Sequence, residues 1–84
     1  MARIEVYLTS WCPFCRGAVQ LLRAKGQEFA VVDLDAEPGR RAEMVQRSGR
    51  RTVPQIFIGD RHVGGFDDLS ELERAGELDL LLES

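Results

Sequence analysis

The chain has 84 residues, of which 44% are hydrophobic and 30% charged, and its formal net charge is −3. This composition is typical of one folded domain and excludes a disordered chain. No apolar run approaches the ~20 residues of a membrane-spanning helix, and Glu5 lies where a secretory signal would be apolar. The negative charge argues against a general nucleic-acid binder. We therefore expect a cytoplasmic protein that binds neither membranes nor nucleic acids.

The charges are unevenly distributed along the chain. Residues 1–59 hold nine basic and six acidic side chains, whereas residues 60–84 hold two basic and eight acidic ones. We interpret the acidic end as the solvated face of terminal helices.

The first three predicted elements are a strand, a helix and a strand. Polar and apolar residues alternate over 3–8, which predicts a strand with one apolar face. Pro13 opens a helix that ends near Gly26, and this places Cys12 at its N-cap. Residues 28–34 form a continuously apolar strand that is suited to burial on both faces.

The second half contains a helix, a hairpin and a further helix. A turn-rich link over 35–39 leads to a helix over 40–48, whose inward residues we predict to be Ala42 and Val45. Strands over 55–58 and 61–63 meet in a hairpin. The following helix is predicted to begin with Asp67 as its N-cap and to end at Gly76, and the residues after it form one last amphipathic turn or two.

This order, β-α-β-α-β-β-α, predicts an α/β fold with one four-stranded mixed sheet. The helix between the first two strands implies that they are parallel, and the last two strands form an antiparallel hairpin. Helices on both faces of the sheet give the simplest packing.

The two cysteines lie in a single Cys-Pro-Phe-Cys motif, from Cys12 to Cys15. One pair is too few for a disulfide scaffold, and so short a loop gains little stability from a disulfide. At an N-cap, the sulfur of Cys12 can accept hydrogen bonds from the amides of Phe14 and Cys15 at the positive end of the helix dipole, which favours a reactive thiolate. Cys15 then lies one turn away, placed to attack a disulfide formed at Cys12. Two cysteines and one histidine are too few for an intrachain zinc site.

Two further segments contain proline or glycine residues that affect the conformation of the backbone. Pro54 begins a strand, and from the residues alone a trans peptide is expected there, whereas a cis peptide would turn the backbone of Val53 toward an extended ligand. The Gly64-Gly65-Phe66-Asp67-Asp68 segment is either a turn with a helix cap or a place where free amides receive a carboxylate.

Together these motifs resemble those of the bacterial dithiol glutaredoxins. Cys-Pro-Phe-Cys, Thr-Val-Pro-Gln-Ile-Phe-Ile over 52–58 and Gly-Gly-Phe-Asp-Asp-Leu over 64–69 occur in that order across nearly the whole chain. The resemblance implies a thioredoxin-like fold in a single domain over 1–84, a cis Pro54, Cys12 as nucleophile and Cys15 as resolving thiol. Pro13 and Phe14 complete the active-site motif.

The resemblance also implies a binding site for glutathione. The residues expected to contact it are Thr52, Val53, Pro54, Gly65, Phe66, Asp67 and Arg16. Two positions depart from the family pattern, because Phe14 replaces the usual tyrosine and Thr9 the usual lysine. Arg16, Arg50 and Arg51 are the candidates to replace that lysine, and His62 is expected at the surface.

The predicted function is that of a glutathione-dependent thiol–disulfide oxidoreductase. Its co-substrate is glutathione, no metal is expected, and its partners are glutathionylated or disulfide-containing proteins, with ribonucleotide reductase a candidate; the protein is expected to be a monomer. One alternative is a glutaredoxin-like electron donor that thioredoxin reductase recharges, against which the pair Asp67-Asp68 argues. Another is a carrier of a 2Fe–2S cluster ligated by Cys12 and glutathione, which Pro13 disfavours because such carriers usually have Cys-Gly-Phe-Ser.

Overall fold

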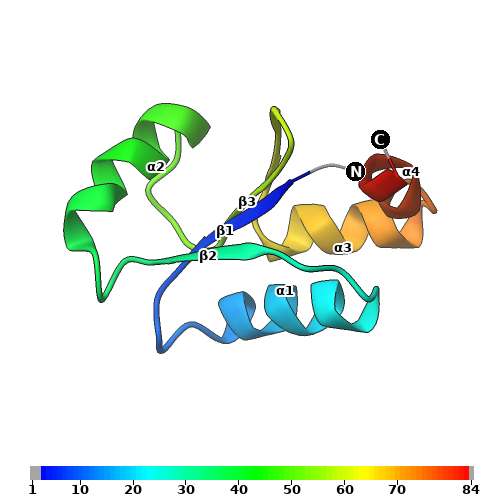
Figure 1. Ribbon diagram of the computed structural model, residues 1–84, viewed down its shortest axis with the longest axis horizontal. Helices are drawn as coiled ribbons and strands as arrows, with labels where there is room; N and C mark the ends of the chain where they lie inside the picture. Colours follow the sequence, from blue (N-terminus) through cyan, green and yellow to red (C-terminus); the bar gives the residue numbers. More distant parts are fainter. Residues whose placement is uncertain (1–2, 84) are drawn as a thin grey trace.

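The fold is built on one four-stranded sheet with the strand order β2-β1-β3-β4. The computed structural model describes residues 3–83. The strands are β1 (Ile4–Leu8), β2 (Ala30–Asp33), β3 (Gln55–Ile58) and β4 (Arg61–Gly64). The helices are α1 (Pro13–Ala24), α2 (Arg41–Ser48), α3 (Phe66–Arg74) and α4 (Leu78–Glu83), and a 3-10 turn, η1 (Pro38–Arg40), precedes α2. This order confirms the predicted arrangement and the thioredoxin-like fold (Figure 1).

The strand directions bring distant segments together at one end of the sheet. Strand β1 runs parallel to β2 and antiparallel to β3, and β3 runs antiparallel to β4. Tyr7, near the end of β1, therefore pairs with Gln55 at the start of β3, and Gly64 at the end of β4 pairs with Ile56. The loop after β1, the loop before β3 and the turn after β4 consequently meet at the same end of the sheet.

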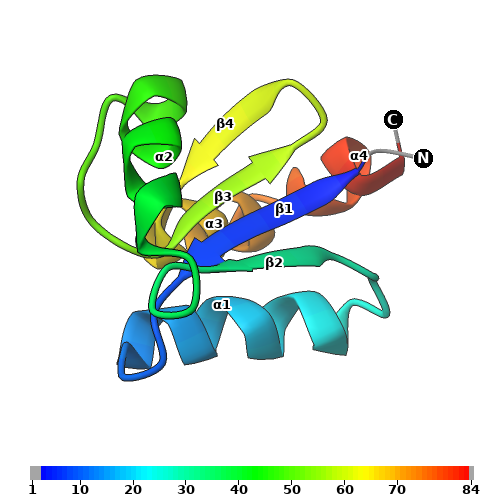
Figure 2. The same ribbon diagram turned by 60° about the vertical axis from the view of Figure 1, so that its left-hand side comes forward.

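Helices cover both faces of the sheet, as predicted. Figures 1 and 2 show α1 and α3 on one face and α2 on the other. Under α1, α3 and α4 lies one apolar cluster, built from Ile4, Val6, Ala18, Leu22, Ile56, Ile58, Leu69, Leu78 and Leu82. Under α2 lies a second, built from Tyr7, Val32, Leu34, Met44 and Phe57. Alternate residues of β1 and β3 enter the two clusters, because successive strand side chains point to opposite faces.

Two details of the core differ from the predictions. Strand β2 is an edge strand, so the predicted burial of both its faces is wrong, and Val31 is 48% exposed. In α2 the fully buried residue is Met44, whereas Ala42 is exposed and Val45 only half-buried. The helix is turned so that Met44 fills the space beside Tyr7, and short side chains at the predicted positions would leave that space empty.

Candidate active site

Cys12 is the N-cap of α1, as predicted. Its backbone is extended, Pro13 follows it in the first turn, and the Cys15 amide donates a hydrogen bond to the Cys12 sulfur at 3.2 Å. Of the two amides expected to contact the sulfur, only that of Cys15 does so. The half-buried sulfur thus lies at the positive end of the helix, where negative charge is stabilised.

Cys15 lies in a different environment, although it is only one turn away. Its side chain is 2% exposed, whereas Cys12 is reachable from solvent, and the structure has both cysteines as free thiols. Burial, reinforced by a hydrogen bond with Cys12, raises the pKa of the Cys15 thiol to about 12. At neutral pH Cys15 therefore keeps its proton, and the two thiols are chemically unequal.

The loop before β3 lies directly against the Cys12 sulfur. The Val53–Pro54 peptide is cis, which confirms the expectation from the family resemblance and corrects the one from the residues alone. The Cys12 thiol donates to the Val53 carbonyl at 3.6 Å, although the two residues are 41 positions apart. The sulfur is thus held between a helix N-terminus and the backbone of Val53.

The buried side-chain amide of Gln55 holds this loop in place through hydrogen bonds. Gln55 is 0% exposed, and its Nε2 donates to the Thr52 carbonyl at 3.0 Å and lies 3.3 Å from the Thr52 hydroxyl. Since a carbonyl only accepts, the amide oxygen of Gln55 faces His62, whose Nε2 is 2.7 Å away and therefore carries a proton. Burial lowers the pKa of His62, and the charge of Arg50 acts in the same direction.

Sequence reasoning missed this network. His62, expected at the surface, is half-buried and packs against the ring of Phe57, with ring centres 5.0 Å apart. The available signal was a glutamine inside an apolar strand, because a buried amide requires hydrogen-bond partners.

Replacing Gln55 with leucine is expected to lower the free energy of unfolding by about 1–3 kcal/mol, because the Thr52 carbonyl and the ring of His62 each lose a partner. Urea unfolding measures the change. Gln46→Leu on the exposed side of α2 is the matched control and should stay within about 0.5 kcal/mol of the parent. Equal changes in the two variants would show that the network contributes nothing to stability.

The turn after β4 is capped differently from the prediction. The N-cap of α3 is Gly65, so the assignment of Asp67 as the cap is wrong. Asp68 provides the capping carboxylate instead: it accepts the Gly65 amide at 2.9 Å and pairs with Arg50 at 3.1 Å. The hydrogen bond from Gly65 and the pairing with Arg50 lower the pKa of Asp68. Gly64 has φ +116°, and a Cβ there would lie 2.8 Å from the Asp68 carboxyl carbon, so the turn requires glycine.

Asp67 is left with an exposed carboxylate at the start of α3. Within residues 3–83 no hydrogen bond or ion pair engages this carboxylate. The backbone amides of Phe66 and Asp67 lie in the first turn of the helix, where amides have no partner inside the helix.

These segments enclose a groove of about 210 Å³, which we call the thiol groove. It is lined by Phe14, Arg50, Thr52, Val53, Pro54, Gly65, Phe66, Asp67 and Asp68. Six of the seven residues expected to bind glutathione are thus brought together, and the seventh, Arg16, is not among them. Arg16 lines a separate pocket beside Cys15, and Arg51 lies in a shallow groove along α2. Of the three candidate arginines, only Arg50 reaches the thiol groove.

Within residues 3–83, no group of three or more histidine, cysteine, aspartate or glutamate side chains could hold a metal ion. None of the helices described is long and apolar enough to cross a membrane.

Comparison with known proteins agrees with this geometry. The family model described as glutaredoxin matches residues 4–63. The chain is 51% identical to a glutaredoxin of Pseudomonas aeruginosa, with all of both chains aligned, and 48% identical to glutaredoxin 3 of Escherichia coli, with 99% of this chain and 100% of that one aligned. A crystal structure of a buckwheat glutaredoxin–glutathione complex superposes with a TM-score of 0.90 at 32% identity, covering 98% of this chain and 77% of that one. Its sequence, its fold and a Cys12 sulfur that contacts the cis Val53–Pro54 peptide together show that this chain belongs to the glutaredoxin family of thiol oxidoreductases.

Proposed function

We propose that this protein is a glutathione-dependent disulfide oxidoreductase, in which Cys12 is the nucleophile and Cys15 the resolving thiol. One observation carries the proposal: Val53, which lines the thiol groove, also contacts the Cys12 sulfur through its carbonyl. A cysteine-containing peptide bound in the groove can therefore present its sulfur to Cys12.

Groups along the groove suit the ammonium of glutathione, the carboxylate next to it and the central cysteine. The free carboxylate of Asp67 suits the ammonium, and the amides that open α3 suit the adjacent carboxylate. The Val53 carbonyl suits the cysteinyl amide, because it loses the hydrogen bond from Cys12 once the sulfur enters a mixed disulfide. Among the relatives, the buckwheat glutaredoxin was solved as a complex with glutathione.

The proposed reaction consists of two thiol–disulfide exchanges. The Cys12 thiolate attacks the glutathione sulfur of a glutathionylated protein, a bond forms between these two sulfurs, and the protein leaves as a thiolate that takes up a proton. A second glutathione thiolate then attacks the glutathione sulfur bound to Cys12. Glutathione disulfide leaves and the Cys12 thiolate is restored, so that two electrons pass from glutathione to the substrate.

Cys15 enters when the substrate is an intramolecular protein disulfide. When Cys12 attacks, one substrate sulfur leaves as a thiolate that takes up a proton. The Cys15 sulfur then attacks the Cys12 sulfur, and the Cys15 proton passes to the second substrate thiolate as it leaves, which releases the substrate as a dithiol and leaves a Cys12–Cys15 disulfide. In the reduced protein the raised pKa keeps Cys15 protonated. Two glutathione molecules subsequently reduce this disulfide.

A coupled assay with hydroxyethyl disulfide, glutathione, NADPH and glutathione reductase tests the proposal. We expect NADPH oxidation that depends on both this protein and glutathione, with the Cys12→Ser variant as the blank. If thioredoxin reductase recharged the protein and glutathione did not, the alternative reading as a thioredoxin-reductase-linked donor would replace the proposal.

Iodoacetamide at pH 7 is expected to alkylate Cys12 and to leave Cys15 unmodified, because Cys15 is buried and its pKa is about 12. Peptide mass spectrometry identifies the modified residue, and the urea-unfolded protein, alkylated at both cysteines, is the control. Similar rates at the two cysteines in the folded protein would contradict the assignment.

The same pKa predicts how stability depends on pH. Cys15 ionises near its ordinary pKa of 9.0 in the unfolded chain and near 12 in the folded one. The unfolded state therefore loses this proton first, and the free energy of unfolding falls as pH rises from about 9 toward 12. Tyr7, whose pKa burial also raises, acts in the same direction.

The setting of the reaction is also part of the proposal. We place the protein in the cytoplasm, as a single-domain monomer over 1–84 that acts on glutathionylated and disulfide-containing proteins, with ribonucleotide reductase a candidate. The support is chemical, since glutaredoxin couples lie at roughly −200 to −230 mV, near the potential of the cytosolic glutathione pool.

A further inference from the structure

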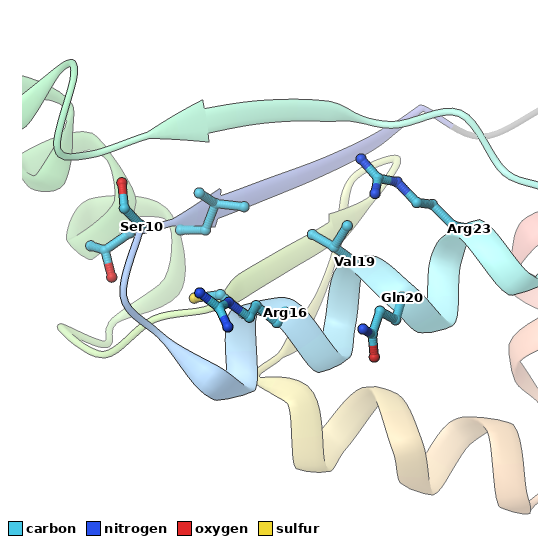
Figure 3. Close-up of a pocket in the computed structure, with 8 residues that line it drawn as sticks. Ser10, Arg16, Val19, Gln20 and Arg23 are labelled. Atoms are coloured by element: carbon cyan, nitrogen blue, oxygen red, sulfur yellow. The ribbon is translucent and has the colours of Figure 1, made fainter.

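A second cavity, which we call the α1 pocket, lies on the other side of the catalytic motif. It has a volume of about 240 Å³ and is formed between the end of β1, the loop after it and the exposed side of α1. It shares no lining residue with the thiol groove. Figure 3 shows Arg16 and Arg23 rising from α1 two turns apart, with Val19 between them and Ser10 beyond the start of the helix. Cys15 forms part of the wall.

The side chains that line the α1 pocket carry a net positive charge. Its lining contains Arg16 and Arg23 but no acidic side chain, and no ion pair engages either guanidinium within residues 3–83. By contrast, Arg40, Arg47 and Arg50 each pair with a carboxylate of the chain. The Asp35 carboxylate, which is not part of the lining, accepts the amide of the pocket residue Ser10 at 2.8 Å and keeps its negative charge.

The α1 pocket begins one helical turn from the nucleophile. The Arg16 amide donates to the Cys12 carbonyl at 3.1 Å, and the 1.5 Å rise per residue puts Arg16 about 6 Å and Arg23 about 16 Å along the axis from Cys12. An extended polypeptide advances about 3.3 Å per residue. In an extended polypeptide that runs along α1 from a cysteine attached to Cys12, residues about two and five positions away would lie level with the two arginines.

An exposed aromatic side chain directly precedes Cys12 in the chain. Trp11, which directly precedes Cys12 and follows the pocket residue Ser10, is 87% exposed. Aromatic side chains and arginines are the residue types enriched where proteins bind other proteins. Trp11 is therefore available, next to Cys12 and Ser10 in the chain, to contact a bound polypeptide.

We propose that the α1 pocket binds acidic side chains of polypeptide substrates, about two and five residues from the cysteine that Cys12 attacks. This rests on the proposed function, and it makes Arg16 and Arg23 determinants of specificity among protein disulfides. Free glutathione disulfide is too short to reach Arg23 while its cysteine is held in the thiol groove. Since both arginines lie near solvent, each should change the rate by about 2–5-fold and both together by about tenfold, with the effect weakening as salt is added.

Two synthetic peptides test this proposal. Both carry one cysteine activated as a mixed disulfide with 5-thio-2-nitrobenzoate; one has glutamates two and five residues away on either side, and the other has glutamines there. When the Cys12 thiolate bonds to the peptide sulfur, thionitrobenzoate leaves with the electron pair and its absorbance reports the rate. In 20 mM salt we expect the glutamate peptide to react about tenfold faster than the glutamine peptide.

The variants decide whether the α1 pocket causes this preference. In Arg16→Gln/Arg23→Gln the rate ratio should fall to about one, whereas in Arg61→Gln/Arg74→Gln, which loses the same charge elsewhere, it should persist. A ratio near one in the parent, or an equal ratio in both double variants, would overturn the proposal. So would a dimer in sedimentation that Arg16→Gln/Arg23→Gln dissociates, because the acidic end of a second copy would then occupy the pocket.

The outcome is separable from that of the proposed function. If the glutathione-coupled assay fails while the peptide preference persists, the proposed glutathione dependence is contradicted and the proposed role of the α1 pocket is supported. If the assay succeeds and the preference is absent, only the assignment of the α1 pocket fails.

Discussion

Replacing Cys12 with serine is expected to abolish reduction both of glutathione mixed disulfides and of protein disulfides. The serine hydroxyl can accept the Cys15 amide bond and so keep the helix cap, but it cannot attack a disulfide at neutral pH. The fold should therefore survive while activity is lost. The coupled glutathione assay and an insulin-reduction assay measure the two activities, and circular dichroism checks the fold.

The Cys15→Ser variant is the matched control within the same motif. It should retain reduction of glutathione mixed disulfides, which needs one thiol, and lose at least tenfold in reduction of intramolecular protein disulfides. The small buried side chain is conserved in size, so the variant should fold. Equal losses in the two assays would contradict the division of roles between nucleophile and resolving thiol.

Replacing Asp67 with asparagine is expected to raise the KM for glutathione about tenfold, with little change in the rate at saturation. A hydrogen bond to a charged group contributes roughly 1.5–3 kcal/mol, and 1.4 kcal/mol corresponds to a factor of ten. Asp67 is the aspartate of the thiol groove whose carboxylate no residue within 3–83 engages, so it is free to bind the ammonium group. Initial rates over a range of glutathione concentrations measure KM.

The neighbouring Asp68→Asn variant should give a different result. Asp68 accepts the Gly65 amide and pairs with Arg50; asparagine keeps an oxygen that can accept this amide but loses the charge, so the free energy of unfolding should fall by at most about 1 kcal/mol. If Asp67→Asn left the glutathione dependence unchanged, the start of α3 would be only a turn and a cap. The proposal of glutathione as the reductant would then lose its binding site.

The place of Cys12 at the start of a helix and the order of strands and helices could be predicted from the sequence alone. Pro13 after Cys12 predicts a helix start with a sulfur cap, and the order of strands and helices predicts a mixed sheet covered on both faces. These predictions depend on residues close together in the chain, since capping and strand alternation act within a few positions. The cis peptide before Pro54 followed from the family resemblance and not from the residues.

Only the tertiary structure decided which distant groups meet. The antiparallel pairing of β1 with β3 brings Val53 to the Cys12 sulfur, and the buried Gln55 joins His62 to the same loop. Periodicity cannot determine which strand lies at an edge or which side of a short helix faces the core, so the predicted burial of both faces of β2 and the predicted inward direction of Ala42 and Val45 are wrong. The direction of an arginine side chain depends on the surface its helix presents, and Arg16 accordingly faces the α1 pocket and not the thiol groove. These features arise from pairing and packing between elements, which short-range propensities do not encode.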